Sequence, residues 1–379
     1  MSAVRRQVAG LARQRLFWPV LILALLLASN LFFTPSFFSI EIREGHLYGS
    51  LIDVLRASTP LVLVAVGMTV VIATGGIDLS VGSVMAIAGA LACLRISELT
   101  DQHSIAGVLL AVAVALALSL LLGLWNGALV AVIGIQPIIA TLILMVAGRG
   151  LAQLITDGQI INVNSAPYKV IGAGYAFTLP VSVLIAAAVV AVAAVLIRRS
   201  ALGMMIESVG GNPTASRLAG IRSRRFIVLA YVFAGLCAGI AGLIFSSNVS
   251  SADGNNAGNL IELDAILAVV IGGTALTGGR FSLAGSVLGA VTIKALDITI
   301  YTIGIPSDAT LLFKALVVIV LCLAQSPAFR SRLAGRRPSG PSGPGGQPAT
   351  VPADQPPATR PADQPPAAPA GDAPAEVRS

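Results

Sequence analysis

A glycine-containing break inside a long apolar stretch constrains the fold of this chain most strongly. Residues 61–94 are apolar up to residue 73, are interrupted at 74–80 by TGGIDLS, and are then apolar again. A helix needs about 20 residues to cross the roughly 30 Å hydrocarbon core, so each arm by itself is short for a full span. Irregular backbone at membrane depth is tolerated where it is buried in protein or lines a wet cavity. The stretch therefore predicts a broken helix of the kind in which transporters expose peptide dipoles to a solute.

The composition indicates a polytopic membrane protein for most of the chain. Of 379 residues, 56% are hydrophobic and only 11% are charged, which is not the composition of a soluble globular protein. The apolar runs predict an all-α fold with about ten transmembrane helices. The predicted helices cover residues 16–33, 51–73, 79–94, 105–132, 138–155, 177–197, 226–245, 260–270, 281–301 and 309–324.

Basic residues flank the apolar runs and predict the topology. The net charge of +7 is not gathered on one soluble face, which argues against nucleic acid and for a membrane lipid environment. Arginines gather in an N-terminal arm, residues 1–15, in the connection 198–225, and just after the last run. This pattern places both termini in the cytoplasm. Residues 326–379 are rich in Pro and Ala, cannot bury an apolar core and are expected to be a disordered cytoplasmic tail, so the membrane domain covers 16–325.

The sequence offers no motif for catalysis, metal binding or nucleotide binding. Cys93, Cys237 and Cys322 stand alone in or beside apolar runs, and His46 and His103 are the two histidines. A Gly-x-x-x-x-Gly-Lys-Ser/Thr phosphate-binding loop is absent from the sequence. We therefore expect no metal and no cofactor, and the chain itself is not expected to be an enzyme.

Polar side chains inside the predicted helices have both structural and functional interpretations. Asn126 either makes a hydrogen bond between helices or lines a pathway. Lys294 and Asp297 are three residues apart on one helix face, which favours a local ion pair over a transport site. Arg149 is costly in lipid and needs a partner, for which Asp157 is one candidate among others.

A second glycine-rich break resembles the first. Residues 271–280 read IGGTALTGGR, and the sequence VVI precedes the glycine pair in both places. Paired breaks in two halves of a transporter point to a binding region near the middle of the membrane. Asp78 either caps the helix that follows the first break, since a carboxylate favours a positive helix N-terminus, or lines the solute route. The predicted pathway residues are Gly75, Gly76, Asp78, Ser80, Asn126, Gln136, Gly272, Gly273 and Thr274.

The basic connection 198–225 contains a short capped helix at residues 212–220. Asn212 is a good N-cap, Pro213 fits the first helical position, and Gly220 fits the left-handed position after the end. An isolated helix of this length is marginal in water. The segment therefore needs something to pack against, and a partner protein is the natural candidate.

Residues 67–82, GMTVVIATGGIDLSVG, resemble the signature of the ribose/galactose-type permeases of bacterial ABC sugar importers. The similarity extends over about residues 16–325 and includes WNG at 125–127, QP at 136–137, GRG at 148–150 and LDAILAVVIGG at 263–273. Within that family it is greatest to the permease subunits of galactofuranose importers, over 142–155 and 255–280. The Pro-rich tail departs from the family pattern.

The resemblance implies a function and a set of partners. The chain would be a permease subunit in the bacterial inner membrane that imports a monosaccharide, galactofuranose or another pentose or hexose. It would work with a second permease subunit, identical or different, a cytoplasmic ATPase that binds and hydrolyses ATP, and a periplasmic or extracellular sugar-binding protein. The resemblance makes 207–221 the segment that couples to the ATPase, with Glu207, Gly211, Asn212, Ala215, Arg217 and Gly220 as its candidate residues. An ion-coupled secondary transporter, or a channel, without an ATPase is the alternative.

The hypothesis for the mechanism is alternating access. A binding protein delivers the sugar to the outer loops, with residues 248–264 as a candidate docking region because they are rich in acids and amides. Closure of the ATPase pushes on residues 207–221. The two breaks around Gly75 and Gly272 then rearrange.

Overall fold

The computed structural model describes residues 16–33, 37–43 and 45–325, and these residues are mostly helical. The predicted basic arm, 1–15, and the predicted tail, 326–379, lie outside them. The helices are α2 (Phe17–Phe33), α3 (Ser50–Ala73), α4 (Val81–Ser97), α5 (Ile105–Ala128) with a π-helical turn η1 (Leu129–Ile133), α6 (Pro137–Ile155), α7 (Ala166–Ala173), α8 (Val181–Arg199), α9 (Leu202–Gly211), α10 (Pro213–Leu218), α11 (Ser223–Val249), α12 (Ile261–Ile271), α13 (Leu283–Ile303) and α14 (Ser307–Gln325).

Each apolar run of the sequence corresponds to a helix whose ends agree to within about one helical turn. Among the described residues, six helices are long and apolar enough to cross a membrane, namely α3, α5 with η1, α6, α8, α11 and α13. The apolar helix α4 is shorter, and α12 has only 11 residues. A polytopic membrane protein is therefore confirmed, and the number of about ten crossings stays a prediction.

The apolar arm 61–73 is short by itself, but it belongs to the longer helix predicted at 51–73, which the structure gives as α3. Helix α3 runs without interruption for 24 residues, about 36 Å at 1.5 Å per residue, because its polar first turns extend the apolar run backwards. Pro60 inside it lacks the N–H that the Arg56 carbonyl would accept, and Thr59 Oγ1 donates to that carbonyl instead at 2.8 Å. The first break therefore follows the end of a full-length helix. By contrast, α12 is about 16 Å long when it reaches the second break.

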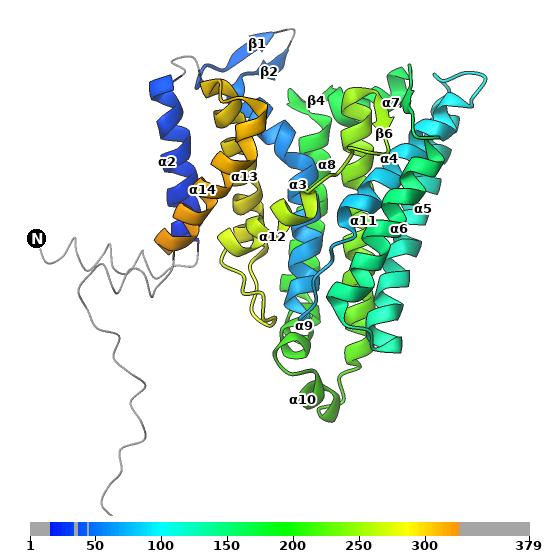
Figure 1. Ribbon diagram of the computed structural model, residues 1–379, viewed down its shortest axis with the longest axis vertical. Helices are drawn as coiled ribbons and strands as arrows, with labels where there is room; N and C mark the ends of the chain where they lie inside the picture. Colours follow the sequence, from blue (N-terminus) through cyan, green and yellow to red (C-terminus); the bar gives the residue numbers. More distant parts are fainter. Residues whose placement is uncertain (1–15, 34–36, 44, 326–379) are drawn as a thin grey trace, which may run out of the picture. The chain divides into compact units, whose positions relative to one another are not determined.

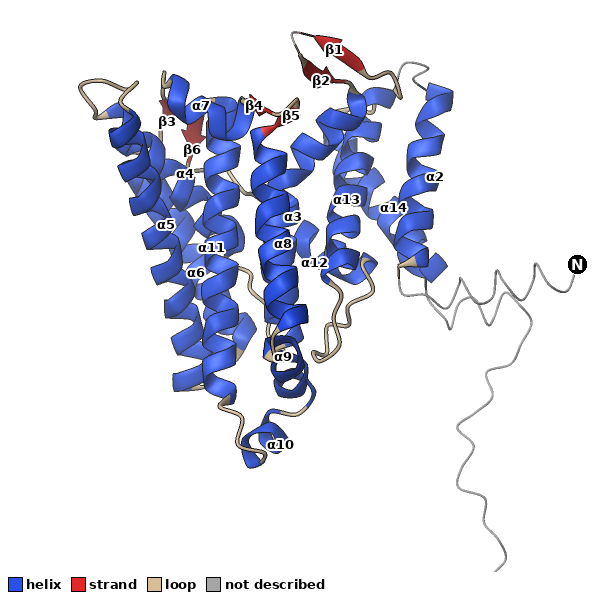
Figure 2. Ribbon diagram, turned by 180° about the vertical axis from the view of Figure 1, so that it is seen from behind, coloured by secondary structure: helices blue, strands red, loops and turns tan. Residues whose placement is uncertain are grey.

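Some of the connections between the helices contain short antiparallel ribbons. They pair β1 (Glu41–Arg43) with β2 (His46–Tyr48), β3 (Ile160–Asn162) with β6 (Ser251–Asp253), and β4 (Tyr175–Ala176) with β5 (Leu179–Pro180). Helix α7 lies in one of these connections, where Ser165 Oγ accepts the N–H of Tyr168. Strand pairing and this cap satisfy backbone groups that a bare loop would leave to water. Both ribbon views place the strands and α7 at one end of the helices, and α9 and α10 at the other (Figures 1 and 2).

Helix α11 packs against α3, α4 and α5 because its small residues allow close approach. A Cβ on Gly235 would lie 2.6 Å from the Ser119 carbonyl oxygen of α5, and one on Gly242 would lie 2.2 Å from the Met85 carbonyl oxygen of α4. Small residues thus let the backbones of these helices approach each other closely, as they do in many membrane helix pairs.

Candidate functional site

Three of the predicted pathway residues form one buried hydrogen-bonded group at the start of α4. Ser80 Oγ donates to Asp78 Oδ1 at 2.6 Å, the Ser80 N–H donates to the same oxygen at 2.9 Å, and Asn126 Nδ2 donates to Ser80 Oγ at 2.8 Å. All three side chains are at most 2% exposed. The Asp78 carboxylate therefore orders the turn that leads into α4, at the positive end of that helix. It is not among the residues that line the cavity described below, and its place in a solute route stays a prediction.

Backbone from both breaks meets α9 at a cluster of glycines that we call the glycine junction, formed by Gly75, Gly210, Gly278 and Gly279 beside Ala73. The Gly279 N–H donates to the Ala73 carbonyl with an N–O distance of 3.0 Å. A Cβ on Gly210 would lie 1.8 Å from that oxygen, and one on Gly278 would lie 3.0 Å from the Gly75 Cα. The two breaks, far apart in sequence, are thus in direct contact with each other and with the helix that precedes α10.

The other predicted pathway residues lie in different surroundings. Gly76, Gly272 and Thr274 are buried, whereas Gly273 and Gln136 are exposed. Thr274 Oγ1 accepts the N–H of the residue before α13, which closes the second break. Gln136 precedes α6 and makes no side-chain cap there. Within 74–80 only residue 75 is exposed, so the first break is enclosed by protein, while the second is exposed at 275–277.

The short helix in the basic connection is formed as the sequence predicts. Asn212 Oδ1 accepts the N–H groups of Thr214 and Ala215 at 3.1 and 3.0 Å, Pro213 is the first helical residue, and Gly220 has a φ of +85°. The candidate coupling residues are all exposed, namely Glu207, Gly211, Asn212, Ala215, Arg217 and Gly220. Leu218 on α10 is 87% exposed. The helix therefore presents an unpaired apolar side chain at the end of the molecule away from the strands.

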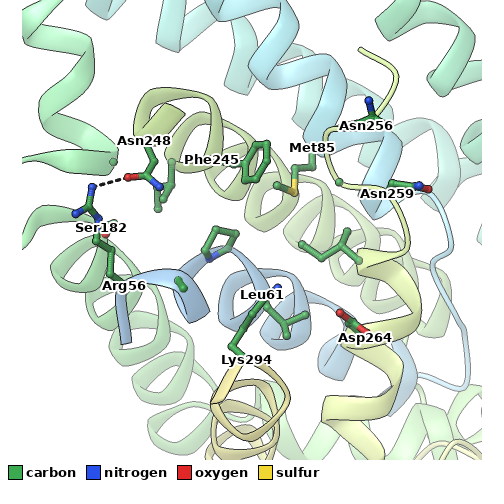
Figure 3. A pocket seen from close by; sticks show the side chains of 16 residues that line it. Arg56, Leu61, Met85, Ser182, Phe245, Asn248, Asn256, Asn259, Asp264 and Lys294 are labelled. Carbon is green, nitrogen blue, oxygen red and sulfur yellow. Dashed lines mark hydrogen bonds between the residues drawn. The ribbon is translucent and has the colours of Figure 1, made fainter. Parts of the chain in front are cut away.

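A cavity of about 330 Å³ (Figure 3), which we call the polar cavity after the amide and charged side chains on its partly apolar wall, lies among α3, α4, α7, α8, α11, α12 and α13. It is close to the strand-bearing end, since its residues lie near the ends of α3, α8 and α11 that adjoin strands. Arg56 donates to Asn248 Oδ1 on one side of it. Ser182 also lines it, with a buried hydroxyl that has no partner among the described residues. Asp264 and Lys294 contribute the other charges. Pockets that bind small molecules have volumes of about 300–1,000 Å³ and a few placed polar groups, so the cavity fits a monosaccharide-sized ligand.

Sequence reasoning named only some of these cavity residues. It identified 248–264 as a delivery region and the Lys294–Asp297 pair as local, and that ion pair is present at 3.0 Å. It missed Arg56 and Ser182, which stand in the first turns of apolar helices and have no spacing signal. Among the described residues, no group of three or more His, Cys, Asp or Glu side chains is placed to hold a metal ion.

Arg149 is satisfied by backbone rather than by Asp157. Its guanidinium donates to the carbonyls of Ala257 and Gly258, in the loop that also borders the cavity. The side chain therefore ties α6 to the segment that leads into α12. Carbonyl groups in a loop cannot be recognised as partners from spacing along the chain, which explains why the sequence left the partner open.

Comparison with known proteins agrees with this architecture. The family described as "Branched-chain amino acid transport system / permease component" matches residues 50–322. The galactofuranose transporter permease protein YtfT of Escherichia coli is 47% identical over 333 residues, which cover 86% of this chain and 95% of that protein. The fructose import permease protein FruF of Bifidobacterium longum is 42% identical and covers 86% and 91%, and the ribose import permease protein RbsC of Haemophilus influenzae is 36% identical and covers 83% and 94%.

No solved structure gives a significant match. The family match extends over most of the membrane domain, from α3 into α14. The relatives are named as permeases, and they align with almost their entire length. Together with the six long apolar helices, these matches show that the chain is an integral membrane protein of this family of transport-system permease components.

Proposed function

We propose that this chain is the permease subunit of an ATP-driven importer that carries a monosaccharide into the cell. The observation that carries the proposal is the polar cavity of about 330 Å³ enclosed by helices near the strand-bearing end. A cavity of this kind inside a membrane protein suits a small hydroxylated solute, because amide and charged side chains on its wall can replace the water that the solute loses. Relatives named for galactofuranose, fructose and ribose suggest a pentose or hexose.

In this proposal the strand-bearing end faces outward and α10 faces the cytoplasm. The basic residues support this orientation. Helix α8 ends with Arg198 and Arg199, and the first turn of α11 contains Arg224 and Arg225, both at the α10 end. A sugar-binding protein would deliver its ligand at the outward end. The sugar would enter the cavity there and leave on the α10 side when the helices rearrange.

A separate ATPase subunit would supply the energy through α10. The exposed Leu218 and the polar residues around it form a small surface suited to a groove on such a partner. The glycine junction joins α9 to both breaks, so a push on α10 would directly reach the end of α3 and the second break, which connects α12 to α13. This contact gives alternating access a physical route from the ATPase to helices that border the cavity.

Reconstituted transport tests the proposal. The permease is purified with the ATPase encoded beside it and placed in liposomes together with the neighbouring sugar-binding protein. Uptake of radiolabelled D-galactose, D-fructose and D-ribose is measured with ATP, with ADP, and with ionophores that collapse ion gradients. We expect uptake of at least one sugar that requires ATP and withstands the ionophores. Uptake that persists with ADP and stops with ionophores would instead support an ion-coupled transporter.

A further inference from the structure

Four charged side chains form an alternating chain across α12, α13 and α14. Lys294 Nζ is 3.0 Å from Asp297 Oδ2, Lys314 Nζ is 3.0 Å from Asp297 Oδ1, and the same Lys314 nitrogen is 2.7 Å from Asp264 Oδ2. The order is therefore Lys294, Asp297, Lys314, Asp264, with opposite charges at every step. We call this set the ion chain.

The ion chain lies inside the helical bundle, where charges are expensive. Its four side chains are between 12% and 30% exposed. Charged residues within membrane helices are rare and mark solute pathways or counter-ions more often than stability devices. Apolar side chains of similar volume would hold the three helices together without the free-energy cost of removing charges from water. We therefore look for a functional reason for these charges.

The two ends of the ion chain line the polar cavity, while its two middle members do not. Figure 3 shows Asp264 and Lys294 among the side chains around that cavity. Asp264 uses Oδ2 for Lys314, and its Oδ1 has no protein partner among the described residues. Lys294 donates one of its three N–H groups to Asp297. The cavity wall thus carries a carboxylate oxygen of Asp264 that can accept a hydrogen bond, and an ammonium group of Lys294 with further N–H groups that can donate.

We propose that Asp264 and Lys294 recognise the sugar, and that Asp297 and Lys314 are positioning residues that hold them in place. A sugar hydroxyl both donates and accepts, so it can donate to Asp264 and accept from Lys294. Hydrogen bonds to charged groups are stronger than those between neutral groups. This inference rests on the proposed function and assigns its substrate contacts.

Lys314 has a particular place in this arrangement, because it comes from a helix that does not border the cavity. It contacts both carboxylates and so fixes the distance between α12 and α13 at the depth of the cavity. Without it, Asp264 and Asp297 would face each other as like charges with no cation between them. The ion chain therefore makes α14 part of the binding site without any contact to the sugar.

A double-mutant cycle tests the proposal in the reconstituted transporter described above. The variants are Asp264→Asn, Lys314→Met and the double variant, and Glu98→Gln is the matched control because it breaks the exposed Arg95–Glu98 pair. Two quantities are measured for each, the thermal midpoint of the purified permease and the initial rate of ATP-driven uptake of the three labelled sugars. The control is expected to match the wild type in both.

Each single variant is expected to lower the thermal midpoint, because Lys314→Met leaves Asp264 without a cation and Asp264→Asn leaves two lysines on the single carboxylate of Asp297. The double variant removes both charges and should recover most of the midpoint. Its uptake should stay roughly tenfold or more below the wild type, because the charged acceptor for the sugar is gone. A merely structural ion chain would let stability and uptake recover together.

Recovery of uptake in the double variant to the wild-type rate would therefore overturn the recognition role of Asp264, while leaving the proposed function intact. A wild-type transporter that moves none of the three sugars with ATP would instead refute the proposed function and this inference with it. A further variant, Lys314→Arg, keeps the charge and is expected to retain uptake close to wild type. A tenfold loss in Lys314→Arg would contradict the positioning role.

Discussion

Replacing Gly210 by alanine tests the glycine junction, which is the physical link between α9 and the two breaks. The new Cβ would lie 1.8 Å from the Ala73 carbonyl oxygen and 2.6 Å from the Gly279 nitrogen, and both are backbone atoms that cannot rotate away. The Cβ would also push into the hydrogen bond that joins these two atoms at 3.0 Å. The helix must therefore move, and the bond must lengthen or break.

The expected magnitude follows from these contacts. Overpacking typically costs about 1–3 kcal/mol, and a lost backbone hydrogen bond costs about 0.5–1.5 kcal/mol. Alanine regains up to about 1 kcal/mol over glycine through helix propensity. The net loss in the free energy of unfolding is then about 1–3 kcal/mol, which lowers the thermal midpoint by roughly 3–10 °C.

The assay compares Gly210→Ala with Gly211→Ala, the next residue in the same helix. A Cβ on Gly211 meets no atom within 4 Å and needs no unusual backbone angle, so this control should keep or slightly raise the midpoint. Thermal unfolding of both variants is followed in detergent, together with uptake in liposomes. Gly210→Ala should bind the ATPase normally, because α10 is unchanged, but transport less sugar for each ATP hydrolysed. Gly211 is itself a candidate coupling residue, so Gly211→Ala is the control for stability alone, and transport by Gly210→Ala is compared with the wild type. Equal midpoints for the two variants, together with wild-type transport by Gly210→Ala, would refute the reasoning about the junction.

Three further predictions concern separate parts of the molecule. Ser80→Ala removes the hydrogen bond from Ser80 Oγ to Asp78 and the one that Ser80 Oγ accepts from Asn126, while the backbone bond to Asp78 stays. The free energy of unfolding should fall by about 1–3 kcal/mol, as measured by thermal unfolding, and an unchanged midpoint would contradict this. Leu218→Ser should weaken binding of the ATPase by roughly tenfold or more without changing the midpoint, as measured by co-purification, because an exposed leucine buried in an interface contributes about 1.5–3 kcal/mol. Hydrogen bonds, chiefly from the Asn256 side chain, hold the pKa of Asp253 below its usual value of 3.8. Because the folded pKa is lowered, the carboxylate stabilises the fold above the unfolded pKa and this stabilisation is lost as the pH falls through the folded pKa. The difference in thermal midpoint between wild type and Asp253→Asn should therefore be constant near neutral pH and shrink below about pH 4. A difference that stays constant below about pH 4 would contradict the lowered pKa of Asp253.

Local chemistry allowed the helices and the short coupling segment to be predicted well. Apolar runs place the helices, since a helix in lipid must be apolar along most of its length. The cap of α10 was also readable, because Asn212, Pro213 and Gly220 each satisfy a local requirement of the backbone. The start of α3 was predicted to within one residue, at 51 against Ser50, although its opening turns are polar.

The candidate site was only partly readable from the sequence. Asp78, Ser80 and Asn126 were chosen as polar residues in apolar surroundings, and the fold brings them together. The cavity itself was missed, because Arg56, Ser182 and Lys294 come from different helices and none has a motif around it. Their shared position depends on how the helices pack, which spacing along the chain does not encode.

The sequence by itself determined a helical membrane permease, with two glycine breaks and a capped basic helix, because hydrophobic length, glycine and capping chemistry act within a few residues. Only the tertiary structure decided that both breaks touch α9, that residues of several helices line one cavity, and that Lys314 joins two carboxylates from different helices. Such contacts form between residues that are distant in the chain. They depend on helix packing, which many small side-chain contacts set together.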